Sequence, residues 1–246
     1  MLLVDVGNTR IKWGCAQDKV MSDYGVLTHR DKPISKVLTS AWDKLRSPAR
    51  VVVANVAGAH IAEELAGFCR QHFQCEPEYM QATSQAGGIT NGYVQPSQLG
   101  ADRWAAVIGA RHRYKGPLCI IDCGTAITVD TVNREGQHLG GLIAPGIGAM
   151  QEALVAAAPA LPKAMGESAT LFAGDTRSAV TSGILHTVAG LVERVAAKIN
   201  AAQGAQTKLL LTGGDAERVQ SMVQVQFILV PHLVLEGLAV LAGQQT

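Results

Sequence analysis

The chain has 246 residues, of which 48% are hydrophobic and 17% charged, and its formal net charge is +1. This composition supports a buried core and excludes a largely disordered chain, while the balanced charge excludes a general attraction to nucleic acid. The sequence has no apolar run long enough to span a membrane and no secretory leader. We therefore expect a cytoplasmic protein that binds neither nucleic acid nor membrane.

The predicted elements follow one order twice, three strands and then alternating helices and strands. In the first half we expect strands at about residues 1–6, 10–17, 20–27, 50–55 and 75–80, and helices at 33–46, 59–72 and 98–114. In the second half we expect strands at about 117–122, 126–133, 136–144, 207–211 and 226–229, and helices at 146–157, 177–201, 215–223 and 232–243. The repeat predicts two α/β domains, residues 1–115 and 116–246, each a mixed sheet flanked by helices in the ribonuclease H-like layout.

A short polar phrase follows the first strand of each half. It reads Asp5-Val6-Gly7-Asn8-Thr9 in the first copy and Asp122-Cys123-Gly124-Thr125-Ala126 in the second. Each strand delivers a carboxylate, the glycine permits a close turn, and the small polar residues offer N–H and hydroxyl donors. This pattern predicts two hairpins that bind phosphate, with magnesium at Asp5 and Asp122. Ordinary hairpin turns use the same residue types, but the duplication favours phosphate binding.

Two further segments add to this interpretation. Strand 207–211 leads into Thr212-Gly213-Gly214, which suits either an adenosine contact or a turn that needs a positive φ, and Asp215 is expected to cap the next helix. Segment 91–104 leads into an apolar helix. Its Asp102 suits either a general base that accepts the proton of an alcohol or a helix cap, and the adjacent Arg103 indicates an anionic ligand or a partner carboxylate.

Together with the Asp5 and Asp122 phrases, segments 91–104, 140–146 and 212–214 resemble the type III pantothenate kinases over essentially the whole chain. This family, which includes the Bvg accessory factors, lies within the superfamily of sugar kinases, actin and heat-shock chaperone ATPases. The resemblance implies two tandem ribonuclease H-like domains with a nucleotide cleft between them. It also implies ATP-dependent phosphorylation of pantothenate to 4′-phosphopantothenate, the first step of coenzyme A synthesis.

The resemblance assigns roles to individual residues. ATP is expected to contact Asp5, Val6, Gly7, Asn8, Thr9, Arg10, Ile11, Lys12 and Thr125. Pantothenate is expected to contact Tyr93, Gly100, Ala101, Asp102, Arg103 and Thr176, with Asp102 as the catalytic proton acceptor. Asp122 becomes the ligand of a monovalent cation, potassium or ammonium, whereas the residues alone suggested magnesium there as well as at Asp5.

The family also implies a homodimer, for which the apolar stripe of the helix near residues 177–199 offers an interface. Core packing explains the same stripe. Two other functions stay open at this point: a nucleotide-binding regulator of transcription without turnover, as in the accessory factors, and a kinase for another small alcohol.

Overall fold

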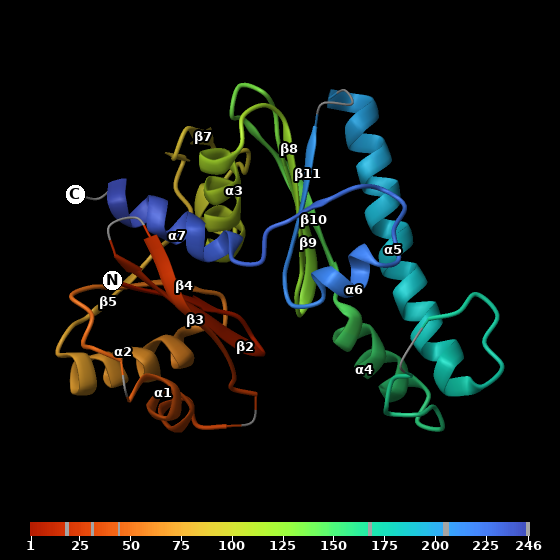
Figure 1. Ribbon diagram of the computed structural model, residues 1–246, viewed down its shortest axis with the longest axis horizontal. Coiled ribbons are helices and arrows are strands. Elements are labelled where there is room, and N and C mark those ends of the chain that lie inside the picture. The colour runs from red at the N-terminus through yellow and green to blue at the C-terminus, as the bar shows by residue number, and fades with distance from the viewer. Residues whose placement is uncertain (18–19, 31, 44, 167–168, 204–206, 245–246) are drawn as a thin grey trace. The chain divides into compact units, whose positions relative to one another are not determined.

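The computed structural model describes residues 1–17, 20–30, 32–43, 45–166, 169–203 and 207–244. The chain divides into two compact units (Figure 1), which we describe separately. Unit 1 comprises Met1–Arg113 together with His232–Thr246, and unit 2 comprises Tyr114–Pro231. In the part of the chain described, no helix is both long and apolar enough to cross a membrane.

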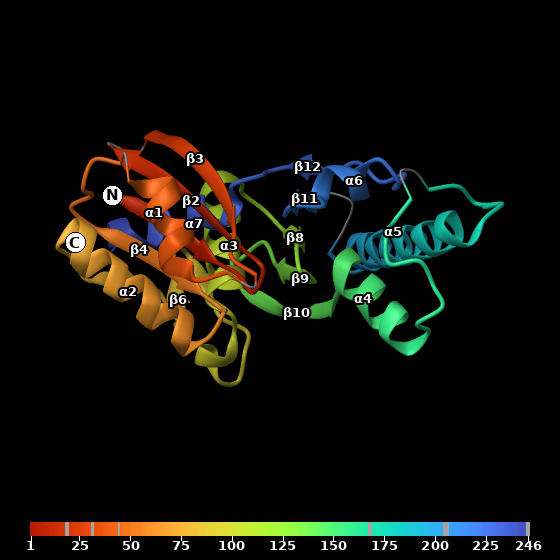
Figure 2. The ribbon, with the colours of Figure 1, turned by 90° about the horizontal axis from the view of Figure 1, so that it is seen from below.

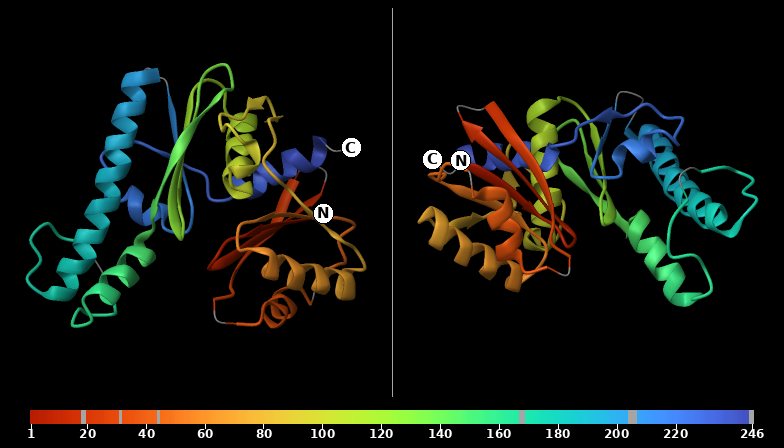
Figure 3. Two further views of the ribbon diagram at one scale, coloured as in Figure 1. Left: turned by 180° about the vertical axis from the view of Figure 1, so that it is seen from behind. Right: turned by 60° about the horizontal axis from the view of Figure 1, so that its bottom comes forward.

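The sheet of unit 1 has the strand order β3-β2-β1-β4-β5. The bounds are Leu2–Val6 for β1, Arg10–Gln17 for β2, Val20–Thr28 for β3, Val51–Asn55 for β4 and Pro77–Tyr79 for β5. The first three strands are antiparallel, and β4 and β5 continue the sheet in parallel with β1. Helices α1 (Ile34–Trp42) and α2 (Ala59–Phe73) cover one face (Figures 1 and 3), where alternate residues of β1 join the aromatic side chains of both helices in one core cluster.

Helices α3 (Ala101–Arg113) and α7 (Leu233–Gln244) pack together in the same unit. The sequence assigned residues 232–246 to the second domain, but α7 contacts α3 and strands β1, β2 and β4 of unit 1. Its apolar side chains explain this position, since Leu233, Leu235 and Leu238 are almost fully buried. The expected division near residues 115 and 116 lies within a few residues of the first chain crossing between the units.

Unit 2 repeats the topology of unit 1 with the strand order β10-β9-β8-β11-β12. The strands are β8 (Leu118–Cys123), β9 (Ala126–Val132), β10 (His138–Pro145), β11 (Lys208–Thr212) and β12 (Ile228–Leu229). The helices are α4 (Ile147–Ala157), α5 (Thr176–Gln203) and α6 (Ala216–Gln220), and Figure 2 shows α4 beside α5. Alternate residues of β8, including Cys119 and Ile121, pack against buried side chains of α5 and α6.

The remaining elements are short and lie between β5 and α3. Strands β6 (Gln85–Ala86) and β7 (Ile89–Thr90) form a two-stranded hairpin, and a 3₁₀ turn (η1) spans Pro96–Gln98. Periodicity predicted none of these, because two- and three-residue elements carry too few side chains to show a pattern. The predicted fold class, two mixed sheets flanked by helices, is confirmed. The predicted nucleotide cleft between the domains stays a prediction.

Candidate active site

The first hairpin joins β1 and β2 through a three-residue turn, residues 7–9. The turn is closed by the Gly7 N–H, which donates to the Arg10 carbonyl at 3.0 Å. Leu2, Val4 and Val6 enter the core cluster beneath α1 and α2. Asp5 therefore faces the opposite side of the sheet, where it is only 8% exposed.

Asp5 has a basic neighbour on the next strand. The residue directly opposite Asp5 on β2 is Lys12, so both side chains project from the same face of the sheet. Lys12 is half-buried. The hairpin thus places a carboxylate and an ammonium group side by side, two strand positions from a turn with exposed backbone, which suits a phosphate and its cation.

The second hairpin joins β8 and β9 through a two-residue turn, Gly124 and Thr125. The Gly124 N–H donates to the Ala126 carbonyl at 3.0 Å, the counterpart of the bond in the first hairpin. Asp122 faces away from the core cluster, as Asp5 does, but its neighbours differ. Thr128 on β9 lies opposite Asp122 in the position that Lys12 has beside Asp5, and Thr212 on β11 lies opposite Asp122 where Ala54 on β4 lies opposite Asp5.

The glycines of both hairpins provide room rather than an unusual backbone conformation. Neither Gly7 nor Gly124 has a positive φ. A Cβ on Gly7 would lie 3.3 Å from the Arg10 carbonyl oxygen, and one on Gly124 would lie 3.3 Å from Asp122 Oδ1. A side chain at either position would therefore press against the groups that form the turn.

Gly213 does have the positive φ that one interpretation of the paired glycines requires, with a value of +99°. A Cβ there would collide with Asp122 Oδ1, and the Asp215 N–H donates to the Cys123 carbonyl at 2.9 Å. The turn after β11 thus packs directly against the end of β8. Asp215 occupies the N-cap position of α6, but its side chain makes no capping hydrogen bond, so the expected capping role was wrong.

The acceptor segment is organised by Asn91, which is 8% exposed. Its side-chain amide donates to the carbonyls of Thr83 and Pro96, and its oxygen accepts from the Tyr93 N–H at 3.0 Å. Arg103 is 6% exposed, and its guanidinium donates to the Tyr93 hydroxyl at 2.9 Å while lying 5.7 Å from the ring centroid. The structure therefore brings Tyr93 and Arg103 into contact, and the pocket that the resemblance implies for them stays a prediction.

Asp102 lies in the first turn of α3, preceded by Gly100 and Ala101. Its Oδ1 accepts from the Arg103 N–H at 2.7 Å, and a Cβ on Gly100 would lie 2.6 Å from the same oxygen. The carboxylate therefore satisfies one helix-terminal donor, as the capping interpretation predicted. It is also half-buried beside the buried Arg103, so this bond leaves the general-base interpretation open.

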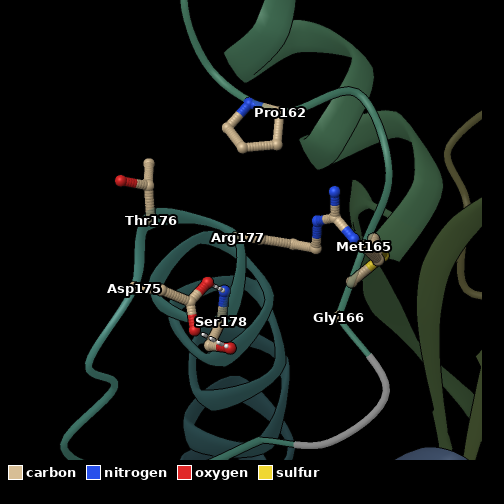
Figure 4. A pocket seen from close by; sticks show the side chains of 7 residues that line it. All are labelled: Pro162, Met165, Gly166, Asp175, Thr176, Arg177 and Ser178. Atoms are coloured by element: carbon tan, nitrogen blue, oxygen red, sulfur yellow. Dashed lines mark hydrogen bonds between the residues drawn. The ribbon is translucent and has the colours of Figure 1, made fainter.

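Thr176 is exposed at the start of α5, beside a cavity of about 730 Å³ lined by Pro162, Met165, Gly166, Asp175, Thr176, Arg177 and Ser178. Asp175 accepts from the backbone N–H and the hydroxyl of Ser178 at 3.0 and 2.7 Å, and these bonds lower the pKa of its carboxyl group. Figure 4 shows these two bonds, with the Arg177 side chain extending towards Met165 and the Thr176 hydroxyl pointing away from both Arg177 and Ser178. Thr176 is thus held on a capped helix end within unit 2.

The donor set fits the cations that the family implies. Among the described residues, no three His, Cys, Asp or Glu side chains gather into a metal cluster. A single carboxylate such as Asp5 suits magnesium, which keeps several waters and takes its other ligands from phosphate. Asp122, with Thr128 and Thr212 opposite, presents oxygen donors only, which suits a monovalent cation equally well.

Four residues in these surroundings have a place that sequence reasoning did not predict, although Thr212 and Asn91 stand in motifs that it singled out. Thr128 and Thr212 follow from strand register, which a single sequence does not give, and Asn91 acts by holding its own loop. His29 lies 6% exposed behind the first hairpin, beside a cavity of about 540 Å³, and no spacing links it to that hairpin. Pairing of β2 with β3 is what brings it there.

Comparison with solved structures supports the same architecture. The chain aligns over its full length with 98% of a Campylobacter jejuni protein described as a Baf family transcriptional activator, at a TM-score of 0.64 and 23% identity. It aligns over 99% of its length with 98% of a glucokinase from an Antarctic psychrotroph, at a TM-score of 0.50 and 13% identity. These likenesses concern the fold alone, which the chain shares with a glucokinase.

Sequence comparison gives the particular family. A family model described as type III pantothenate kinase matches residues 1–198. The chain is 38% identical to a type III pantothenate kinase of Nitrosococcus oceani, over 97% of this chain and 92% of that protein. It is 39% identical to one of Herminiimonas arsenicoxydans, over 98% and 97%. The protein belongs to the type III pantothenate kinase family, and it is a kinase.

Proposed function

We propose that the protein transfers the γ-phosphoryl group of ATP to pantothenate, which yields 4′-phosphopantothenate for coenzyme A synthesis. The observation that carries this proposal is the recurrence of one Asp-x-Gly hairpin at the same place in two sheets of identical strand order, in a chain of this family. The alternative of a regulator without turnover is not favoured, because the curated relatives are named as kinases.

Each hairpin has a role in holding ATP. The turns of residues 7–9 and 124–125 supply backbone N–H groups and the side chains of Asn8, Thr9 and Thr125 as donors to phosphate oxygens. Lys12 adds a positive charge beside Asp5, which balances phosphate charge at the point of transfer. Asp5 would hold magnesium and Asp122 a monovalent cation, and these ions neutralise phosphate charge when bound.

The acceptor segment has to bind a small molecule with a carboxylate at one end and a primary hydroxyl at the other. Arg103, fixed by Tyr93, is suited to the carboxylate, because guanidinium groups bind carboxylates with two parallel hydrogen bonds. Asp102 is suited to orienting the hydroxyl and accepting its proton as the new O–P bond forms. Gly100 and Ala101 complete this segment, and Thr176 is proposed as a further donor to pantothenate.

A coupled assay of ADP release, run with and without pantothenate and over a panel of other small alcohols, tests the proposal. Asp102→Asn should lower kcat by roughly two to four orders of magnitude, as loss of a general base does. Asp43→Asn, the same change at the C-terminal end of α1, serves as the matched control and should leave kcat unchanged. ATP binding without pantothenate-dependent ADP release would contradict the proposal. Near-normal turnover of Asp102→Asn would show that Asp102 only caps α3 and is not the general base.

We also propose a homodimer. A shallow apolar cavity of about 570 Å³ lies between α4 and α5, lined by Met150, Leu154, Leu161, Thr176, Ala179, Val180, Gly183, Ile184 and Thr187. The lining includes five residues of the apolar stripe predicted on the long helix, which are Ala179, Val180, Gly183, Ile184 and Thr187. Leu154→Glu should shift the protein to monomer in analytical ultracentrifugation, whereas Leu171→Glu, at a more exposed apolar residue outside this cavity, should not. Location in the cytoplasm stays a prediction.

A further inference from the structure

His29 makes two hydrogen bonds to the turn of the first hairpin. Its ring nitrogen Nε2 lies 2.7 Å from the Gly7 carbonyl oxygen, and its backbone N–H donates to the Thr9 carbonyl at 3.2 Å. A carbonyl oxygen only accepts, so Nε2 carries the proton and donates it. His29 is 6% exposed, so water competes little for this bond.

The first bond determines which way a peptide group faces. The peptide between Gly7 and Asn8 is trans, so its C=O and N–H point in opposite directions. Because the Gly7 carbonyl points at His29, the Asn8 N–H points away from His29. The Gly7 N–H is already used by the Arg10 carbonyl within the turn. The Asn8 N–H is therefore a turn donor whose direction His29 sets.

We infer that His29 is a positioning residue for ATP, which orients the Asn8 N–H towards a phosphate oxygen by holding the Gly7 carbonyl from behind. The inference rests on the proposed role of this hairpin in binding ATP. Without the imidazole donor, the Gly7 carbonyl loses this partner and the peptide is free to turn over, which would aim an oxygen at the phosphate instead of an N–H.

Two substitutions separate this role from simple packing. His29→Leu fills much of the space and removes the donor, whereas His29→Gln places an amide N–H near the position of Nε2. We expect His29→Leu to weaken binding of a non-hydrolysable ATP analogue, measured by calorimetry, on the order of 10- to 100-fold, the effect of losing a buried hydrogen-bond partner. His29→Gln should recover most of the affinity. The KM for pantothenate should change little in either variant.

His72→Leu is the matched control, because His72 also bonds a backbone carbonyl, that of Phe68 at 3.1 Å, but on α2 and away from the hairpin. It should leave affinity for the ATP analogue unchanged. An independent reading comes from ¹H–¹⁵N spectra of the wild-type imidazole, in which His29 should carry its proton on Nε2 before any nucleotide is added.

The outcomes are distinguishable from a failure of the proposed function. If the wild-type protein binds the ATP analogue but does not phosphorylate pantothenate, the proposed function fails while the comparison of Leu and Gln variants still decides the role of His29. Equal affinity in all variants, equal losses in the Leu and Gln variants, or a neutral wild-type His29 protonated only on Nδ1 would each overturn the inference. A wild-type protein that does not bind the analogue would overturn both.

Discussion

Gly237→Ala tests the close packing of α7 on α3. A Cβ at residue 237 would collide with the carbonyl oxygen of Ala105 and lie 2.5 Å from its carbonyl carbon. From the other helix, a Cβ on Gly109 would lie 2.6 Å from the Leu233 carbonyl oxygen. The obstacle at each position is backbone, so no side chain can rotate away and the two helices must separate.

The expected magnitude combines two opposing terms. Overpacking of a tight contact typically costs about 1–3 kcal/mol, while replacing glycine by alanine inside a helix gains about 1 kcal/mol. Because the overlap here is with backbone, we take the upper part of the range and expect Gly237→Ala to lower the free energy of unfolding by about 2 kcal/mol. Gly67→Ala in α2 is the matched control, since nothing lies within 4 Å of its Cβ and it should raise the same free energy by about 1 kcal/mol.

Urea unfolding of the two variants measures this difference, provided that the free energy of unfolding falls with urea concentration at the same slope in both. Activity gives a second reading, because Ala105 lies one helical turn after Asp102. Displacing α3 at Ala105 should lower kcat/KM for pantothenate on the order of 10- to 100-fold through misplacement of Asp102 and Arg103. If Gly237→Ala proves as stable as Gly67→Ala, the helices do not touch as closely as described and the reasoning fails.

Three further predictions concern one hydrogen bond, the buried thiols and one ion pair. Tyr93→Phe removes the hydroxyl that holds Arg103, and steady-state kinetics should show a rise of about tenfold or more in the KM for pantothenate but not for ATP. Burial raises the pKa of the Cys69, Cys119 and Cys123 thiols to about 12. Ellman's reagent at pH 8 should therefore label only the half-buried Cys15 and Cys75 in the native protein, and the other three thiols only after urea has unfolded it. Labelling of those three in the native protein would contradict their burial. The hydrogen bonds from Arg50 lower the pKa of the Glu78 carboxyl group in the folded protein, so their contribution is present above the unfolded pKa and is lost as the pH falls through the folded one. Both side chains are about one-third exposed, so Glu78→Gln should lower the free energy of unfolding near neutral pH by less than about 1 kcal/mol. In a series of urea unfolding curves at falling pH, the variant should lose correspondingly less stability towards acid than the wild-type protein; an identical pH dependence would contradict the pairing.

Local pattern was enough to predict most of the fold. In each half a run of apolar residues leads into an aspartate and a glycine turn follows, so the strands and both hairpins could be located from sequence alone. The assignment of α7 could not, because an apolar helix at the end of the chain does not reveal which sheet it covers. The small glycines of α3 and α7 became meaningful only once the two helices were seen to touch.

The residues of the candidate site likewise fall into two groups, those that a local motif predicts and those that only the fold brings to the site. Asp5, Asp122 and Asp102 stand in motifs whose spacing is local, so the sequence alone was enough to propose them as site residues. His29 and Thr212 reach the hairpins through strand pairing with distant segments, and their residue types are common in any protein. Tyr93 and Arg103 lie in one segment, but their hydrogen bond depends on how Asn91 folds the loop.

Unit 1 is assembled from both ends of a chain whose middle forms unit 2. On the ribosome, residues 114–231 emerge as one continuous stretch and have every strand of their sheet available before α7 is made. Most of unit 1 is synthesised earlier, but the apolar side of α3 stays exposed until α7 has been synthesised and packs against it. Shortening the C-terminus, or fusing a bulky tag to it, is therefore expected to interfere with the maturation of the half that carries Asp5 and Asp102.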